Sequence, residues 1–461
     1  MLDMKLKVAA KLDPQFTPLS LVCREMREKT KDNGQDIVIA IERSKDLVAT
    51  YKTRIFLDHT GHDEENFKFV ERIVKSMAWI VGGHKIIIAG SEEMGKRIKA
   101  AYSEGGLRAF DVATMKKVFE RDVEVEIRPI EDAPESKSAA TPIGRHLDGC
   151  RIGFDAGGSD RKVSAVINGE SVYSEEVVWF PKTQSNPDYH YQGILEAMKT
   201  AASHLPRVDA IGVSSAGVYI NNRIMIASLF IQVSDEDFEK KVKNMYLDVA
   251  REIGENIPIE VANDGDVTAL AGAMDLDDNA VLGVAMGTSE AGGYVDPEGN
   301  LTGWLNELAF IPVDYSEDAM VDEWSGDYGC GVKYFSQDAV IKLAPAAGIA
   351  LDPTLSPAEK LKVVQGLMAQ GDKRAADIYD TIGVYFGYAI AYYAEFYDIK
   401  HVLIMGRVTS GEGGVILLHR AQEVLDKEFP ALAQKITLHI PDEKSRRVGQ
   451  SVAAASLPKI N

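Results

Sequence analysis

Four short apolar strands within residues 150–418 each run directly into a turn rich in glycine, hydroxyl or acidic residues. The junctions read GFDAGGSD from Gly153, EVANDGD from Glu260, VAMGTSEAGG from Val284 and LIMGRVTSGEGG from Leu403. Helix-like segments lie between these and other strands. Strands that alternate with helices predict an α/β fold with partly parallel sheets.

Residues 1–133 carry α/β patterning of their own but none of these glycine-rich junctions. The hydrophobic pattern predicts a hairpin, a helix, a strand, a helix and a strand, and therefore a small α/β domain. These segments are Ile37–Ile41, Leu47–Leu57, Glu64–Ile80, Lys85–Ala89, Glu92–Tyr102 and Val123–Pro129. Proline, serine, alanine and charged residues then accumulate, and we assign residues 134–149 to a linker.

Composition and charge disfavour several classes of protein. The chain of 461 residues is 45% apolar and 26% charged, which is typical of globular proteins and not of disordered ones. Its formal net charge of −19 argues against nucleic acid as a partner, because a negative surface repels phosphate. The three cysteines form no C-x-x-C pair, so neither a disulfide framework nor a sequence-local zinc site is indicated.

The sequence also argues against membrane insertion. The first residues, MLDMKLKVAAKLDPQF, have no long apolar core, so we expect no secretory signal. The least polar long window, Thr381–Tyr393, has 13 residues, which is too short to cross a bilayer and predicts a buried helix. We therefore expect a cytoplasmic protein without a membrane partner.

The first junction has the residue types of a phosphate-binding turn. Asp155 stands at the end of a strand, and Gly157, Gly158 and Ser159 turn the chain into the next strand. Glycine lets a phosphate approach backbone N–H groups, and an aspartate at this point can hold a hydrated Mg²⁺ ion. A tight β-turn with an aspartate cap is the alternative interpretation.

The remaining junctions have chemical and purely structural interpretations as well. Asp264, which follows Asn263, is suited to accept a proton from an attacking hydroxyl, but both residue types are also favoured helix N-caps. The turn at Gly287 and Thr288 is of the kind that wraps a phosphate, although glycine-rich hairpin loops are common. Gly406 lies in a strand–turn–helix unit where an adenosine could sit, or in an ordinary βα unit.

The order and spacing of the four junctions are more specific than any one of them. DAGGS is followed after about 110 residues by ND, after about 23 more by GTS and after about 118 more by MGR. This arrangement resembles the superfamily of sugar kinases, actin and Hsp70 chaperones. Within it, residues 150–461 resemble the ROK family (repressors, open reading frames and kinases), including the segments GVSSAGVYINNRI and RVGQSVAAASLP.

The resemblance implies a fold of two RNase-H-like (actin/hexokinase-type) lobes around a cleft, at residues 150–265 and 266–461. The closing helix is a candidate to return to the first lobe. Residues 1–133 do not resemble the winged-helix domain of the family's repressors and add a small α/β domain of open role. A homodimer is implied by the same resemblance.

The resemblance also implies roles for individual residues. Asp264 would be the catalytic base, Asn263 would orient the sugar and Glu307, in GWLNELAF, would bind it. Asp155 would hold Mg²⁺ through water. The residues implied to bind ATP and its phosphates are Asp155, Gly157, Gly158, Ser159, Gly287, Thr288, Gly292, Gly293 and Gly406.

The chain departs from the ROK pattern where that family binds sugar and zinc. Phe310 stands in place of a histidine, and Val332 in place of a glutamate that follows the last cysteine of the zinc motif. Glu323 and Ser325 stand where two cysteines are usual, which leaves Cys330 alone. One thiolate cannot form a structural zinc site, so we predict no zinc.

Further departures lie in the turns themselves. Glu290 and Ala291 replace an apolar residue and a glycine in the second turn, and Arg407 replaces a glycine beside Gly406. A carboxylate near ATP phosphates is repulsive unless it points away or binds metal.

We predict an ATP- and Mg²⁺-dependent kinase that phosphorylates a hydroxyl of a sugar or sugar derivative. Two alternatives remain: a non-catalytic ligand-sensing or regulatory protein with the same fold, and a kinase of the superfamily that acts on a non-sugar acceptor. Phe310, Val332 and Glu290 favour the sensor, whereas the intact DAGGS, ND and GTS segments favour a kinase. Because Phe310 and Val332 make the acceptor pocket less polar, plain glucose should be a poor acceptor.

Overall fold

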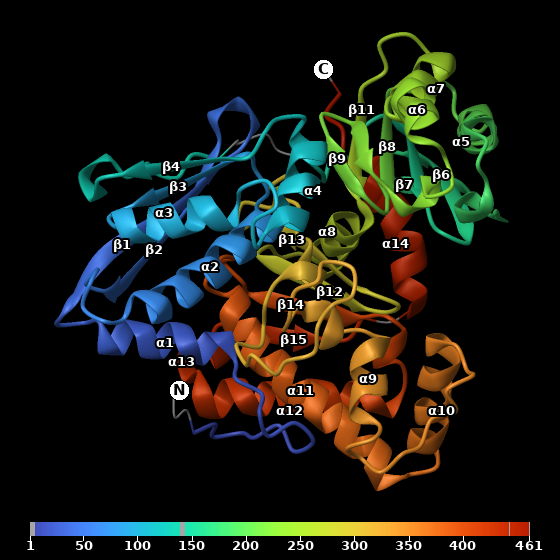
Figure 1. The fold of residues 1–461 in the computed structure, drawn as a ribbon. Helices are drawn as coiled ribbons and strands as arrows, with labels where there is room; N and C mark the ends of the chain where they lie inside the picture. Colours follow the sequence, from blue (N-terminus) through green and yellow to red (C-terminus); the bar gives the residue numbers. More distant parts are fainter. Residues whose placement is uncertain (1–4, 139–142, 442, 461) are drawn as a thin grey trace. The chain divides into compact units, whose positions relative to one another are not determined.

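The computed structural model describes residues 5–138, 143–441 and 443–460 (Figure 1). Its contacts divide the chain into two compact units. The first unit contains Met1–Ala139, Val284–Gly292 and Trp304–Ile440, and the second contains Ala140–Gly283, Gly293–Gly303 and Pro441–Asn461. Residues 1–133 therefore lie in one unit with most of the C-terminal half. Of the linker predicted at 134–149, residues 139–142 lie outside the described residues.

The second unit is built on a five-stranded sheet with the order β11-β8-β5-β6-β7. β5 pairs antiparallel with β6, and β6 antiparallel with β7, whereas β8 and β11 extend the sheet parallel to β5. This order is the RNase-H-like arrangement that the resemblance implies. The strands are β5 (Cys150–Ala156), β6 (Asp160–Ile167), β7 (Glu170–Val178), β8 (Ala210–Ser215) and β11 (Ile259–Asn263).

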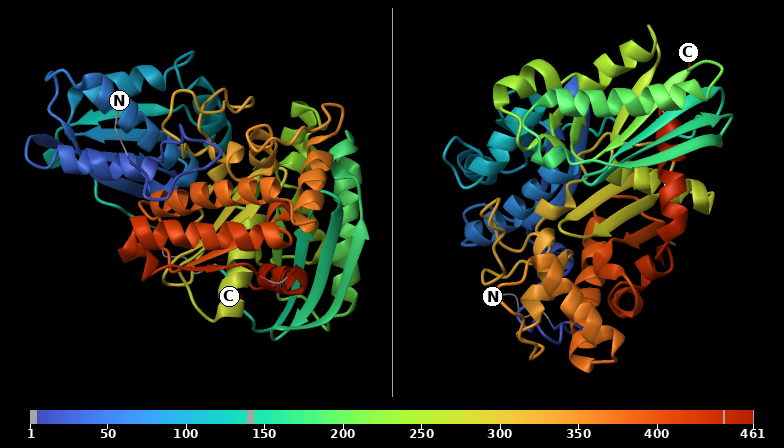
Figure 2. Two further views of the ribbon diagram at one scale, coloured as in Figure 1. Left: turned by 90° about the horizontal axis from the view of Figure 1, so that it is seen from below. Right: turned by 90° about the vertical axis from the view of Figure 1, so that its right-hand side faces the viewer.

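Helices cover both faces of this sheet, as the right-hand view of Figure 2 shows. On one face, Ile152 and Phe154 of β5 join a core with side chains of α5 (Pro187–Ser203) and α7 (Met245–Ile253). On the other, α14 (Glu443–Ala455) packs closely, because a methyl group at Gly153 or Gly212 would overlap its backbone. Every residue of β5 is buried, which explains its nearly continuous apolar sequence.

Residues 34–128 of the first unit form a four-stranded sheet of order β2-β1-β3-β4, in which only β3 and β4 are parallel neighbours. All four strands and the helices expected at 64–80 and 92–102 are confirmed, whereas α1 and α4 were not predicted. The strands are β1 (Gly34–Glu42), β2 (Val48–Phe56), β3 (Lys85–Ala89) and β4 (Glu124–Arg128). The helices are α1 (Leu19–Lys29), α2 (Asp63–Ile80), α3 (Glu92–Ala101) and α4 (Ala109–Phe119).

A further sheet has the order β13-β12-β14-β15. This is the RNase-H-like order with four strands; the described residues include no fifth strand next to β13. Its strands are β12 (Val281–Met286), β13 (Glu290–Val295), β14 (His401–Met405) and β15 (Thr437–His439). The helices that follow β13 are α9 (Gln337–Leu343), α10 (Pro357–Ala369), α11 (Lys373–Tyr393), α12 (Glu412–Glu428) and α13 (Pro430–Ala433).

The long apolar window predicted as a buried helix forms the second half of α11, and its residues are buried. α11 lies beside α12, as the left-hand view of Figure 2 shows. Gly383 and Gly387 permit this approach, because a Cβ atom at either position would lie within 2.7 Å of α12 atoms. Among the described residues, no helix is long and apolar enough to span a bilayer.

Candidate functional site

Three parallel strands of the second unit end at the same edge of its sheet. In the strand register Asp155 lies opposite Ser214, and Ser215 lies opposite Asn263. Asp264 follows directly as the first residue of α8 (Asp264–Leu276). The structure thus brings together the aspartates of the first two junctions, which are more than 100 residues apart in the sequence. The carboxyl ends of parallel strands are where α/β proteins bind ligands.

Asp155 is a buried carboxylate with a neutral hydrogen-bond partner. Its side chain is 7% exposed, and its Oδ1 accepts a hydrogen bond of 2.9 Å from the Ser214 hydroxyl. Burial raises its pKa to about 6, with further increases from the negative charges of Asp264 and Asp160. The Ser214 hydrogen bond and the Lys162 charge oppose these effects without cancelling them. Asp155 is therefore costly to ionise in the folded protein.

Asp264 is half-buried and held at the start of α8. Asn263 is the N-cap: its Oδ1 accepts the Gly265 N–H at 2.7 Å, and its Nδ2 donates to the Gly217 carbonyl at 2.7 Å. Burial raises the pKa of Asp264, whereas its hydrogen bond from the Gly265 N–H and the positive charge of Lys182 lower it. The structural interpretation of Asn263 as a cap therefore applies, and Asp264 joins Asp155 as a second acidic group of this edge.

Lys182 is a cation at this edge that the sequence analysis missed. It lies in a short 3-10 helix, Pro181–Thr183, after β7. A Cβ atom at Gly158 would lie 3.1 Å from its Nζ, so the lysine side chain lies across the glycine turn of the first junction. Its ammonium group is exposed, and its charge acts on Asp264. No motif marks this lysine in the sequence, where it lies four residues after the end of β7.

The turn at Gly287 and Thr288 lies in the first unit, beside the fourth junction. Arg407 donates through Nη2 to the Thr288 hydroxyl at 2.8 Å. Gly406 has a φ of +101°, and a side chain there would overlap the carbonyl of Met286 at the end of β12. Glycine is therefore required for the two turns to adjoin. Arg407, which stands where the ROK pattern has a glycine, thus places a guanidinium group next to the Thr288 hydroxyl.

The structure places the rest of the GTSEAGG segment in β13, outside the turn. Glu290 is 3% exposed, whereas Thr288 is exposed. The Tyr393 hydroxyl donates to Glu290 Oε1 at 3.2 Å, and burial raises the pKa of Glu290 to about 8. Its carboxyl group thus points away from the turn and is mainly protonated at neutral pH. Gly292 and Gly293 are buried in the strand, where they permit close packing and do not belong to the exposed turn.

Glu307 stands at the end of helix α2, held through its backbone. Its N–H donates to the Trp79 carbonyl at 3.0 Å, and the N–H of Asn306 donates to the Ile80 carbonyl at 2.9 Å. These two carbonyls end α2 and lack intrahelical partners, so the Glu307 segment satisfies the helix end. The N-terminal region therefore fixes the backbone of the predicted sugar-binding residue.

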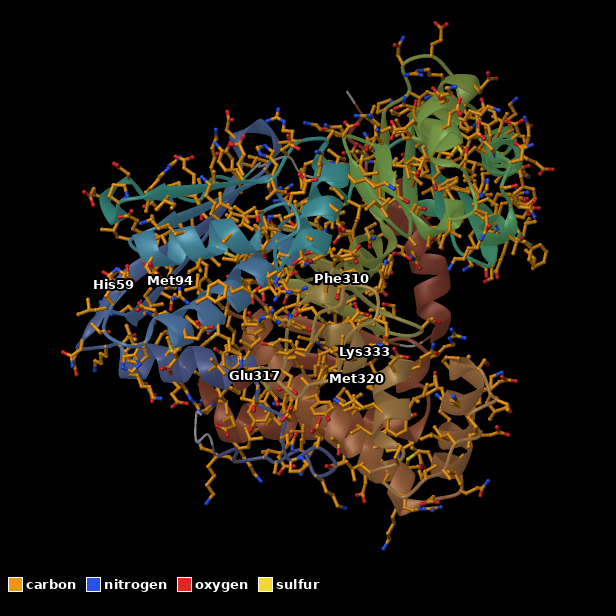
Figure 3. All side chains as sticks on the ribbon, in the orientation of Figure 1. His59, Met94, Phe310, Glu317, Met320 and Lys333 are labelled. Carbon is orange, nitrogen blue, oxygen red and sulfur yellow. The ribbon has the colours of Figure 1, made fainter. Side chains whose placement is uncertain are left out.

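Phe310, which is labelled in Figure 3, lies one 3-10 turn after Glu307. It packs in a group of aromatic rings. Its ring centroid is 4.2 Å from that of Trp79, 5.8 Å from that of Phe110 and 5.7 Å from that of Trp324. The substitution of histidine by phenylalanine thus extends an aromatic surface whose other members come from α2, α4 and the 322–327 turn.

The positions of the family's zinc motif are engaged in other contacts. Glu323 forms an ion pair of 2.5 Å with Lys333, which is labelled in Figure 3, and Ser325 donates to Asp322 at 2.6 Å. Cys330 is buried, and burial raises the pKa of its thiol to about 12, so it is not a thiolate at neutral pH. Among the residues that the structure describes, no three His, Cys, Asp or Glu side chains are arranged to hold a metal ion.

Next to Cys330 lies a cluster of six buried charges that the sequence analysis also missed. Asp327 accepts from Arg72 at 3.0 and 3.1 Å and forms ion pairs of 3.0 Å with both Lys75 and Arg108. Three acids and three bases, each at most 5% exposed, make up the cluster: Glu71, Arg72, Lys75, Arg108, Asp111 and Asp327. Charged residues within the otherwise apolar stretch VERIVKSMAWI of α2 are the only sequence signal for it. We refer to this set as the ion cluster.

Comparisons with solved structures gave several ROK proteins of low sequence identity. A solved ROK family transcriptional regulator, a homologue of the E. coli MLC protein, superposes with a TM-score of 0.50 at 17% identity, over 68% of this chain and 79% of that one. A ROK hexokinase from Thermus thermophilus gives a TM-score of 0.49 at 16% identity, over 66% and 97% of the two chains. A ROK glucokinase from Streptomyces griseus in complex with glucose and AMPPNP gives 0.45 at 19% identity, over 66% and 98%.

A search of curated proteins gave no match. The family description "ROK family" matches residues 151–452, which is about two thirds of the chain and includes all four junctions. The chain belongs to the ROK family.

Proposed function

We propose that this protein transfers a phosphoryl group from ATP to a hydroxyl of a sugar or sugar derivative, with Mg²⁺. One observation carries the proposal: Asp155 and Asp264 meet at the carboxyl edge of three parallel strands, and burial raises the pKa of both. Buried acids with raised pKa values and no cation in direct contact are typical of catalytic sites. The proposal includes a cytoplasmic setting and a homodimer.

In this mechanism Asp264 is the general base. Its raised pKa brings the carboxylate nearer to the pKa at which a base accepts a proton efficiently at neutral pH. Asn263 and the Gly265 N–H hold it at the first turn of α8, so little reorganisation is needed when a hydroxyl approaches. Glu307, fixed by the end of α2, is proposed to bind another hydroxyl of the acceptor.

The acidic edge also fits a hydrated Mg²⁺ ion. Asp155 is raised in pKa partly by the charges of Asp264 and Asp160, and a divalent cation would relieve that repulsion. Oxygen donors of this kind are what Mg²⁺ prefers, and it retains most of its waters. When bound with ATP, the ion supplies charge neutralisation for the transferring phosphoryl group.

Two glycine turns and two cations are proposed to bind the phosphates. In the second unit, Gly157, Gly158 and Ser159 form a turn in which Gly158 and Ser159 are exposed, and Lys182 lies beside Gly158. In the first unit, Gly287, Thr288 and Gly406 lie beside Arg407, with Thr288 exposed and the Gly287 N–H bonded to the Ser289 carbonyl. The buried, largely protonated Glu290 removes the repulsion that the sequence suggested for this turn.

A ligand-sensing function is the second candidate. Phe310, in place of a polar histidine, removes one sugar contact and joins the aromatic surface instead. A ROK regulator has the same fold, so the fold does not distinguish the two functions.

The decisive experiment is an ADP-release screen of the purified protein with Mg²⁺ and a panel of sugars, amino sugars, sugar derivatives and small acids. Asp264→Asn is the matched inactive control. Acceptor-dependent ADP release by the wild type, absent in the variant, supports the proposal. Release that persists in Asp264→Asn contradicts the assigned base. No turnover with any acceptor, together with binding of a sugar, supports the sensor.

A further inference from the structure

Trp324 is exposed on a turn that is held rigidly at both ends. Its side chain is 75% exposed, the largest value among the exposed large hydrophobic residues that the structure describes. The buried Asp322 accepts from the Ser325 N–H at 2.8 Å and from its hydroxyl at 2.6 Å. The backbone of Asp322 also bonds with Asp327 and Gly326, both at 2.8 Å. The tryptophan therefore lies at the tip of a closed turn.

The ion cluster anchors the far end of the same turn. Asp327, 5% exposed, is bound by Arg72, Lys75 and Arg108 at 3.0 Å each. These contacts attach the turn to α2 and to the start of α4. The ring of Trp324 is thus presented to solvent by a preorganised backbone, which lowers the entropy cost of using it to bind a ligand.

The exposed ring adjoins the predicted acceptor site. Its centroid lies 5.7 Å from that of Phe310 and 6.4 Å from that of Phe110, and both of these rings are only half-buried. Phe310 is the last residue of the 3-10 turn that Glu307 begins, and its N–H donates to the Glu307 carbonyl at 3.2 Å. An aromatic surface therefore starts at the sugar-binding segment and continues outward to Trp324.

A tryptophan exposed in this way is costly unless something covers it. Contiguous aromatic patches such as Trp324 with Phe310 and Phe110 mark binding sites, since aromatic rings contribute much apolar area with few rotatable bonds. The charged groups of the turn are engaged: Asp322 and Asp327 are buried, and the exposed Glu323 is paired with Lys333. The surface therefore suits an uncharged ring with an apolar face, rather than a phosphate or a carboxylate.

We propose that Trp324 and Phe310 form a stacking subsite for a ring attached to the acceptor sugar, so that the preferred acceptor is a glycoside and not a free hexose. This inference rests on the proposed function for the identity of the acceptor but not for the existence of the subsite. The apolar face of a second sugar ring and an aryl aglycone have the same stacking chemistry.

The test measures the affinity of the full-length protein for methyl glucoside, phenyl glucoside and the disaccharides cellobiose and maltose, by calorimetry with both anomers of each glucoside. Stacking on one aromatic ring corresponds to about 2–12-fold in affinity. We expect phenyl glucoside, or a disaccharide, to bind the wild type more tightly than methyl glucoside by such a factor. A preference for the disaccharide over phenyl glucoside identifies a sugar as the natural second ring.

Trp324→Ala should abolish this preference and leave the affinity for methyl glucoside within about twofold, because only the outer ring meets the tryptophan. Trp324→Phe should retain it in part. Phe180→Ala, which removes another exposed aromatic ring (62% exposed) in the second unit, is the matched control and should change nothing. An unchanged preference in Trp324→Ala, or no binding of any glycoside by the wild type, overturns the subsite.

ADP release from the same glycosides separates this inference from the proposed function. Binding that depends on Trp324 without any ADP release keeps the subsite and refutes the kinase. ADP release with the same preference in Trp324→Ala keeps the kinase and refutes the subsite.

Discussion

The two units of this protein bury carboxylates in opposite ways. In the first unit, Asp327 is surrounded by three cations at 3.0 Å, and the ion cluster as a whole has equal numbers of acids and bases. In the second unit, the hydrogen bond to Asp155 comes from a neutral hydroxyl, and the nearest acids, Asp264 and Asp160, raise its pKa further.

This difference separates a structural use of buried charge from a functional one. A balanced cluster gives each buried charge an opposite one and fixes the geometry of the elements that supply them, here α2, α4 and the 322–327 turn. An unbalanced pair of acids costs stability in the folded protein and provides a site where a cation or a proton binds favourably. The sign of a mutation's effect on stability should therefore differ between the two regions.

The largest effect is expected on turnover at Asp264. Asp264→Asn removes the base, and the loss of a positioned general base costs about 10²–10⁴-fold in rate. The folded protein should not be less stable, because the amide replaces a carboxylate that burial disfavours. Steady-state ADP release and calorimetric ATP affinity measure the two effects, and ATP affinity should hardly change. Asp275→Asn, which changes an exposed acid of the same helix, is the control. Wild-type turnover in Asp264→Asn would exclude Asp264 as the base.

The largest effect on stability is expected at Asp327. Asp327→Asn leaves three buried cations with two acids, and breaking a buried ion network in this way costs about 3–5 kcal/mol. Urea unfolding at pH 7 measures the loss, and Asp318→Asn, an exposed acid nearby in the sequence, is the control. Adding Lys75→Met should restore part of the stability, because the charge balance returns. A loss below about 0.5 kcal/mol would show that the cluster is not structural.

The opposite sign is expected at Asp155. Its folded pKa, about 6, lies above its ordinary value, so the folded state binds a proton that the unfolded state has lost between about pH 4 and pH 6. The free energy of unfolding contributed by this group therefore falls as the pH rises through that window. Asp155→Asn should stabilise the protein by roughly 1–3 kcal/mol at pH 7.5, by an amount that shrinks towards pH 4.5, while turnover is lost.

Urea unfolding at the two pH values checks this expectation, with the exposed Glu255→Gln as the control. Destabilisation of Asp155→Asn at pH 7.5 would mean that a cation or another partner already compensates the carboxylate.

The smallest effect is expected at Lys182. Its side chain is exposed, so Lys182→Met should change stability by less than about 0.5 kcal/mol. The KM for ATP should rise about 3–10-fold, the order expected for one charge-assisted contact to phosphate. The acid limb of the pH–rate profile should shift to higher pH in this variant, because Lys182 lowers the pKa of Asp264. Lys182→Arg should restore both the KM for ATP and the pH profile, and Lys199→Met, the control, should change neither of them. An unchanged pH profile in Lys182→Met would show that Lys182 does not act on Asp264.

Much of the fold was predictable because its signals are local. The apolar strand before each glycine or aspartate turn marks a strand end, and the alternation of strands and helices limits the sheet order. Asp155, Asn263 and Asp264 could be expected at one edge because parallel strands end together. The helix α4 was missed because its apolar residues show no clear helical period. The helix α1 does have such a period, at Leu19, Val22, Cys23 and Met26, which the prediction did not use.

The environment of each side chain was less predictable. Glu290 looked like an acid beside phosphates, but its strand position turns it towards Tyr393 and away from the exposed turn. Gly292 and Gly293 looked like part of the phosphate turn, but they serve the packing of β13. Lys182 belongs to no motif and comes near Gly158 only through the path of the chain after β7.

The sequence by itself determined where strands end in polar turns and which residues depart from the ROK pattern, since both depend on neighbours along the chain. Only the tertiary structure decided which buried charges meet opposite charges, because those contacts join distant segments. Arg72 and Asp327 are 255 positions apart, and nothing local to either residue indicates the other. Asp155 and Asp264 are likewise distant, but there folding brings like charges together, and the energy of that repulsion depends on the burial that the sheet and its helices create.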